Sequence, residues 1–155
     1  MKTNFKALTA LAITLAGSAN AAEKFLVVRM GYATVDTDRK VMQEFNHCSD
    51  EIVSRATAYM TAACDEALKL TIERAGAAPS LLRGYSLFDE AAANRLGIAA
   101  AYSNAALAHW LTGDVTAAKI LMQQATATAP QVAFVLSNGQ TFAKIAAAVT
   151  PLVSN

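Results

Sequence analysis

The sequence predicts a mainly α-helical single domain, built as an all-α bundle or as stacked helical hairpins, with a short extended segment near its N-terminal end. From residue 39 onward, apolar residues recur mostly at spacings of three and four, which is typical of amphipathic helices. The chain has only three prolines and seven glycines, and several of them fall where one periodic stretch gives way to the next. With 155 residues, 54% hydrophobic and 16% charged, it has the length for one modest core and is too apolar to be disordered.

The first residues have the composition of a cleavable secretory signal peptide. Lys2 and Lys6 make a basic start, residues 7–16 carry no charge, and small residues follow up to Ala21. This order of a basic region, a short apolar region and a small-residue exit predicts cleavage after Ala21, so that the mature chain begins at Ala22. A transmembrane anchor is the alternative, but roughly ten apolar residues is about half the length that a bilayer requires.

Removal of residues 1–21 would leave one helical domain over residues 22–155. The basic count falls from 13 to 11 with Lys2 and Lys6, against 12 acidic residues, so the net charge changes from +1 to −1. A nearly neutral chain has no electrostatic reason to bind nucleic acid or an anionic membrane. Beyond the leader, no uncharged run has the density of large apolar residues that a spanning helix needs. We therefore expect a periplasmic or secreted protein with no membrane span in the mature chain.

Two cysteines are present, and an even count in an exported chain predicts one disulfide. A continuous helix through Cys48 and Cys64 would hold their Cα atoms roughly 24 Å apart, whereas a bridge requires about 7 Å or less. The chain is therefore expected to fold back near residues 58–61. Two buried unpaired thiols are one alternative. A catalytic thiol at Cys48 beside His47 is another, although adjacent helical residues point about 100° apart.

The remaining elements follow in chain order. Residues 25–30 combine aromatic and β-branched residues and predict a strand, for which residues 131–136 are the one other candidate partner beyond the leader. Asn138-Gly139 after that stretch suits a hairpin, or Gly139 caps a short helix. Asp114 is expected to cap the helix that follows it by accepting an N–H bond. The expected helices lie within 39–75, then at 81–96 with a stop at Gly97, at 98–111, at 115–128 and at 141–149.

Residues 99–132 combine small residues where two helices would cross, a glycine at a turn and a proline at the end. The pattern is carried by Tyr102, Ala106, His109, Gly113, Ala118, Met122, Ala125 and Pro130. This stretch resembles a tetratricopeptide repeat, a helix–turn–helix unit of about 34 residues. A weaker copy of the pattern lies over residues 48–81, where Ala67 and Pro79 have the same separation as Ala118 and Pro130. The resemblance implies a short α-solenoid arrangement of helical hairpins, with a binding groove lined mainly by the first helix of each pair, here residues 98–111.

Residues 27–67 have an extended start, Tyr32 and Asp36 four residues apart, and the two cysteines, with Ala63 before Cys64. In these features they show a fainter likeness and resemble small secreted UrcA-like proteins. This resemblance implies an exported compartment and no particular chemistry.

No constellation of residues points to catalysis or to a cofactor. The two histidines are far apart in sequence, and no metal-ligand spacing, nucleophile elbow or glycine-rich phosphate loop occurs. The acidic residues stand at helical spacing and are typical of the hydrated faces of helices. We therefore expect no metal, no cofactor and no enzymatic activity.

The C-terminal part is the region in which a partner surface is expected. Residues 91–155 carry three cations and one acid, so much of their surface is weakly polar, as contact sites often are. Our first hypothesis is an exported, non-enzymatic helical module that binds a protein or peptide, or associates with itself. A small thiol-dependent enzyme and a purely structural envelope protein are the alternatives. Aromatic residues and amides are common at interfaces, and the candidate contact residues are Tyr102, Asn104, His109, Trp110 and Gln123.

Overall fold

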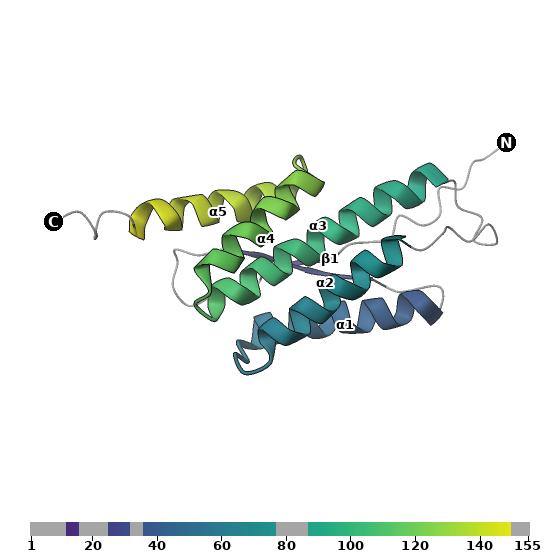
Figure 1. Ribbon diagram of the computed structural model, residues 1–155, viewed down its shortest axis with the longest axis horizontal. Coiled ribbons are helices and arrows are strands. Elements are labelled where there is room, and N and C mark those ends of the chain that lie inside the picture. The colour runs from purple at the N-terminus through teal and green to yellow at the C-terminus, as the bar shows by residue number, and fades with distance from the viewer. Residues whose placement is uncertain (1–11, 16–24, 32–35, 77–86, 150–155) are drawn as a thin grey trace.

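The computed structural model describes residues 12–15, 25–31, 36–76 and 87–149, and these form five helices and two short strands (Figure 1). The prediction of a mainly helical protein with a short extended segment is confirmed. In Figure 1 the strands lie behind the helices. The elements are β1 (Ala12–Leu15), β2 (Leu26–Arg29), α1 (Asp36–Ser54), α2 (Met60–Gly76), α3 (Leu87–Leu111), α4 (Val115–Thr128) and α5 (Ala133–Val149).

The strand predicted at residues 25–30 is present as β2, but its partner differs from the one expected. β2 pairs antiparallel with β1, which falls inside the stretch expected to be a leader, with Ala12 opposite Arg29 and Leu15 opposite Leu26. Residues 131–136 are not a strand: they include the start of α5. Their β-branched and aromatic composition suits a strand, but packing of Phe134 and Val135 into the core decides in favour of a helix. The predicted cleavage site between Ala21 and Ala22 lies outside the described residues.

Helices α1 and α2 form an antiparallel hairpin, as the two cysteines require. The turn between them spans residues 55–59 and contains Arg55 in the left-handed region, at φ 56°. Phe45, Cys48 and Ile52 recur on one face of α1 and are buried, and Met60 and Cys64 begin the corresponding face of α2. The predicted reversal of the chain near residues 58–61 is therefore confirmed, with the turn beginning a few residues earlier.

Helix α3 runs without interruption through Gly97, so the two helices expected on either side of this glycine are one. Glycine lowers helix propensity by about 1 kcal/mol, which the burial of the residues that follow it can offset. Residues 99–101 and 103–108 are buried, and α3 packs against α1, α2, α4, α5 and β2. It is the central helix of the molecule. The first part of the helix expected at residues 81–96 lies outside the described residues.

Gly97→Ala is expected to stabilise the protein by about 1 kcal/mol, because alanine costs less backbone entropy in a helix interior. A Cβ built at this position would lie 3.6 Å from Met30 Cε and 3.8 Å from Thr71 Cγ2, which are ordinary contacts. Chemical denaturation followed by circular dichroism measures the change. Gly113→Ala is the matched control and should destabilise, because Gly113 has φ +92°. A loss of stability in Gly97→Ala would contradict this account.

Helices α3 and α4 form a second hairpin, broken where the sequence predicted. Gly113 makes the turn, and the Asp114 side chain accepts a hydrogen bond from the Ala117 amide at 3.0 Å, so the predicted cap is confirmed. Helix α5 begins earlier than expected and contains Gly139 in its interior, so this glycine is not a helix cap. The buried ring of Phe142 on α5 packs 5.1 Å from that of Phe25, between ring centroids.

Candidate functional site

Three asparagine side chains bind the backbone of β2 and of Met30, the residue that follows it, along one edge. Each amide accepts from the N–H of a strand residue and donates to the C=O of the same residue, as a neighbouring strand would. The bonded residues alternate along the strand, and each asparagine comes from a different helix. The pairs are Asn138 of α5 with Leu26 (2.8 and 2.9 Å), Asn104 of α3 with Val28 (3.0 and 2.8 Å), and Asn46 of α1 with Met30 (2.9 and 3.0 Å). We call these three residues the asparagine ladder.

The asparagine ladder allows a strand to lie against helices without leaving buried backbone groups unpaired. Asn104 and Asn138 are fully buried, and a buried amide or peptide group without a partner is costly. Two serines complete the network. Asn104 Nδ2 lies 3.2 Å from Ser49 Oγ, which in turn lies 2.7 Å from the Val28 oxygen, and Asn138 Nδ2 donates to Ser103 Oγ at 2.8 Å. The network fixes the register of β2 on α1, α3 and α5.

The opposite edge of β2 faces β1. Because successive peptide groups of a strand point to opposite edges, Val27 and Arg29 present their N–H and C=O groups to β1, where Thr14 and Ala12 stand opposite them. Arg29 ends the strand with an ion pair to Asp50 of α1. β2 therefore has one edge closed by side chains of the helices and one edge closed by a single short strand.

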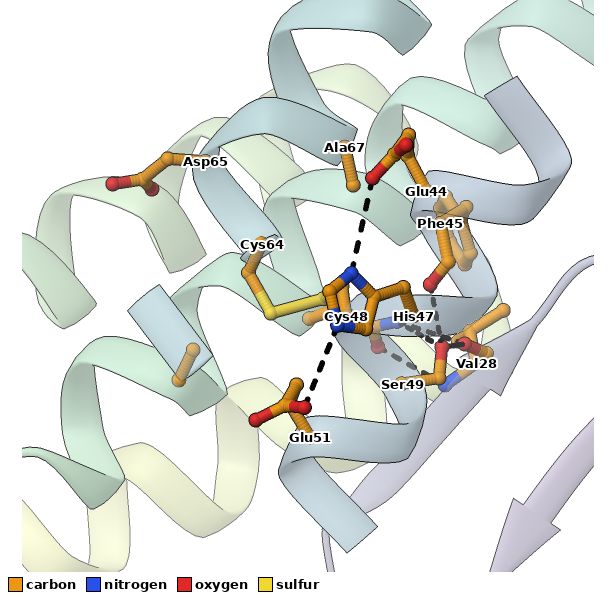
Figure 2. The surroundings of a disulfide bond; sticks show 12 residues. Val28, Glu44, Phe45, His47, Cys48, Ser49, Glu51, Cys64, Asp65 and Ala67 are labelled. Atoms are coloured by element: carbon orange, nitrogen blue, oxygen red, sulfur yellow. Dashed lines mark hydrogen bonds and ion pairs between the residues drawn. A yellow bond between two sulfur atoms is a disulfide. The ribbon is translucent and has the colours of Figure 1, made fainter. Parts of the chain in front are cut away.

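The disulfide joins Cys48 of α1 to Cys64 of α2, with their Cα atoms 4.6 Å apart (Figure 2). Both cysteines are buried, and they belong to the same core as Phe45 and Ala67. The bridge lies near the turn end of the hairpin, since Cys48 stands six residues before the end of α1 and Cys64 is the fifth residue of α2. It therefore holds α1, which contributes Asn46 to the asparagine ladder, against α2.

His47 lies next to Cys48 in sequence, but its side chain is turned to the surface of α1. Its Nδ1 lies 3.8 Å from Glu44 Oε2 and its Nε2 lies 3.5 Å from Glu51 Oε1, on the preceding and following turns. Figure 2 shows the ring between these two carboxylates. The imidazole is thus engaged by acidic groups, and both sulfurs are bonded to each other. The arrangement offers no thiol for His47 to activate.

His109 sits at the end of α3 between two carboxylates from other elements. Its Nε2 lies 3.1 Å from Asp65 Oδ1 of α2, and its Nδ1 lies 3.5 Å from Asp114 Oδ2 at the start of α4. The imidazole side chain is 17% exposed, whereas both carboxylates are more than half exposed. His109 therefore links three helices at the surface, and this contact accounts for its position in the fold.

The other predicted contact residues are not gathered on one exposed surface. Trp110 packs edge-on against Phe142, with ring centroids 5.6 Å apart, and Tyr102 is partly buried against the core. Gln123 is exposed on α4. The expectation that Asn104 contacts a partner is wrong, because this side chain is fully buried and bound to Val28.

The sequence does not mark Asn46 or Asn138 as site residues, although both belong to the asparagine ladder. Their signal in the sequence is weak, because an asparagine within a helix is more often exposed. The sequence indicates burial of Asn104 more strongly, since this residue stands in a long uncharged stretch that is rich in alanine. A buried helix face that contains an asparagine implies a bonding partner, and here that partner is the strand.

The comparisons with known proteins give no relative. No protein-family model matches the chain, and no match to a curated protein or a solved structure is found. Among the described residues, no group of three or more His, Cys, Asp or Glu side chains is placed to hold a metal ion. None of the helices within the described ranges combines the length and apolar character needed to cross a membrane.

Proposed function

We propose that this chain is an exported, non-enzymatic helical module of the periplasm or the secreted fraction, which binds another protein or peptide. The observation that carries the proposal is the buried disulfide between Cys48 and Cys64, in a chain whose first 21 residues have the composition of a signal peptide. Disulfides persist in oxidising compartments and are rare in the cytosol. The disulfide therefore supports the proposed export, and an oxidising compartment outside the cytosol would in turn preserve the disulfide.

The binding part of the proposal draws support from the α3–α4 hairpin. The small residues of the tetratricopeptide-like pattern, Ala106, Ala118 and Ala125, are fully buried. Small side chains at such positions let helices approach closely, as the resemblance implies. Tyr102, which is partly buried on α3, and Gln123, which is exposed on α4, are the contact residues that this proposal retains.

A thiol-dependent enzyme is the competing function, and the geometry gives it less support. It needs a reactive thiolate with access to solvent. Cys48 and Cys64 are 1% and 0% exposed and bonded to each other, and His47 is held by Glu44 and Glu51. The second alternative is a purely structural envelope protein. This alternative predicts that no partner contacts Gln123, whereas the binding module that we propose predicts one.

The export step is tested by the intact mass of the protein that leaves the cytoplasm of a bacterial host expressing the whole chain. We expect the mass of residues 22–155, and a gain of two hydrogens when a reductant and denaturant are added. A mass that still includes residues 1–21, or one that reduction leaves unchanged, would contradict the proposal.

The binding step is tested by placing a photo-crosslinking amino acid at Gln123 and irradiating intact cells. We expect a discrete cross-linked product, and its loss when Tyr102→Ala is added. Lys69, exposed on α2, is the matched control position and should give no such product. Equal products from both positions would indicate nonspecific contact, and none from Gln123 would favour the structural alternative.

A further inference from the structure

We propose that removal of the leader opens the outer edge of β2, and that this edge then binds an extended, uncharged, apolar segment of a partner protein as an added antiparallel strand. The inference rests on the proposed function, because it requires that the chain lose residues 1–21. It adds a second binding surface, on β2, to the contact residues proposed on α3 and α4. β1 (Ala12–Leu15) lies wholly within the proposed leader and is the strand that covers this edge in the full chain.

The groups that would bind the partner are the backbone atoms that β1 now engages. Residues Leu26, Val28 and Met30 use their peptide groups on the asparagine ladder. The peptide groups of Val27 and Arg29 point to the other edge and pair with β1. Loss of β1 leaves these donors and acceptors without their strand partner. A strand edge with free backbone groups is a template for another strand.

The strand stays in place when β1 is removed, because its other contacts come from the helices. β2 packs against α1, α3 and α5, whereas the one described element with which β1 makes extensive contact is β2. The asparagine ladder holds the strand in a fixed register on those helices. An edge that is already ordered loses little conformational entropy on binding, which favours affinity.

The composition of β1, which covers the outer edge of β2 in the full chain, indicates the chemistry of the partner segment. Ala12-Ile13-Thr14-Leu15 is uncharged, contains two β-branched residues and runs antiparallel to β2. The one charged side chain of the strand, Arg29, is paired with Asp50, so the edge offers no unpaired cation to an acidic peptide. Backbone pairing supplies the affinity, and a segment of similar composition in a partner would be accepted in the same orientation.

Hydrogen exchange of individual amides in the exported, purified protein tests whether the edge is open. We expect the amides of Val27 and Arg29 to exchange fast, and those of Leu26, Val28 and Met30 to exchange slowly. The last three are an internal control, since the asparagine ladder binds them whether or not β1 is present. Slow exchange at Val27 and Arg29 at every protein concentration would show an edge closed by the chain itself, and would overturn the inference.

A synthetic peptide with the sequence of residues 9–17 is the probe for the occupant. We expect it to bind the exported protein with a stoichiometry of one and to slow exchange at Val27 and Arg29. N-methylation at Thr14 removes an N–H that faces β2 and should weaken binding by at least about tenfold. N-methylation at Ile13, whose N–H faces away, is the matched control and should change it little. Equal affinities of the two methylated peptides would overturn the inference.

Two further outcomes separate this inference from the proposed function. Exported protein that lacks residues 1–21 but does not bind the peptide would contradict the inference and leave export intact. Exported protein that retains those residues would contradict the processing on which both depend. The protection of Val27 and Arg29 from exchange could also rise with protein concentration, together with a doubled molecular mass. That result would show that a second copy of the chain binds the edge, and it would overturn the proposal of a segment from a partner protein.

Discussion

Asn104→Ala is expected to lower the free energy of unfolding by about 3 kcal/mol, because it leaves a fully buried peptide N–H without a partner and opens a small cavity. The Asn104 side chain is 0% exposed and binds both the N–H and the C=O of Val28. Ser49 Oγ remains within reach of the Val28 oxygen, so the N–H is the group that loses its partner. Urea unfolding followed by circular dichroism measures the change.

The matched control is Asn46→Ala, which removes the same kind of bidentate bond to Met30 in a partly buried position. Water can reach these peptide groups more easily, so we expect a loss of about 1 kcal/mol. Equal losses of unfolding free energy in the two variants would show that burial does not determine how much an unpaired peptide group costs. A loss below about 0.5 kcal/mol in Asn104→Ala would contradict the role assigned to the asparagine ladder.

Asn104→Asp distinguishes a lost bond from a lost volume, since the two side chains have nearly the same size. An ionised carboxylate still accepts from the Val28 N–H, but it faces the Val28 oxygen without a donor and carries a buried charge. At pH 7 we expect Asn104→Asp to lose more unfolding free energy than Asn104→Ala. This difference between the two variants should become smaller as the pH falls, because the neutral carboxyl group can donate a hydrogen bond to the Val28 oxygen again.

Removal of the disulfide has the second large expected effect. Cys48 and Cys64 are 16 residues apart in sequence, and closing a loop of that length contributes about 3 kcal/mol in the chain-entropy model. We expect the double variant Cys48→Ala/Cys64→Ala to lose at least this amount, since both positions are also buried. Thermal unfolding of the variant and of the reduced natural chain should show similar losses.

The control for this prediction is the reductant itself. It should lower the midpoint of unfolding of the natural chain and leave the double alanine variant unchanged. A natural chain that is fully reduced by mass and unfolds at the same temperature as the oxidised one would contradict the role given to the bridge.

The helical architecture could be predicted from local patterns, since these depend on residues close in sequence. The reversal between Cys48 and Cys64, the break at Gly113 and the cap at Asp114 all follow from spacing and turn chemistry. Errors arose where tertiary packing overrides local preference. Gly97 does not end its helix, because the residues from 99 onward that follow it are buried in the core, and residues 131–136 include the start of a helix although their composition favours a strand.

The asparagine ladder could not be predicted from the sequence, because it depends on where a strand crosses three helices. Asn46, Asn104 and Asn138 have no common spacing, and their partners are up to 112 residues away. The pattern around Asn104 favours a contact surface, because an amide on a helix has the same local pattern whether it binds water, a partner or a buried strand. The apolar composition of residues 12–15 is typical of a leader, so it does not predict the pairing of β1.

The long separations within the asparagine ladder have a consequence for biosynthesis. The amide groups that seat Leu26 come from the last helix, so the N-terminal segment has no complete docking site until Asn138 has emerged from the ribosome. During translation, β2 can therefore dock fully only after the start of α5 has been synthesised. Under the export that we propose, translocation can therefore begin before β2 is fully docked.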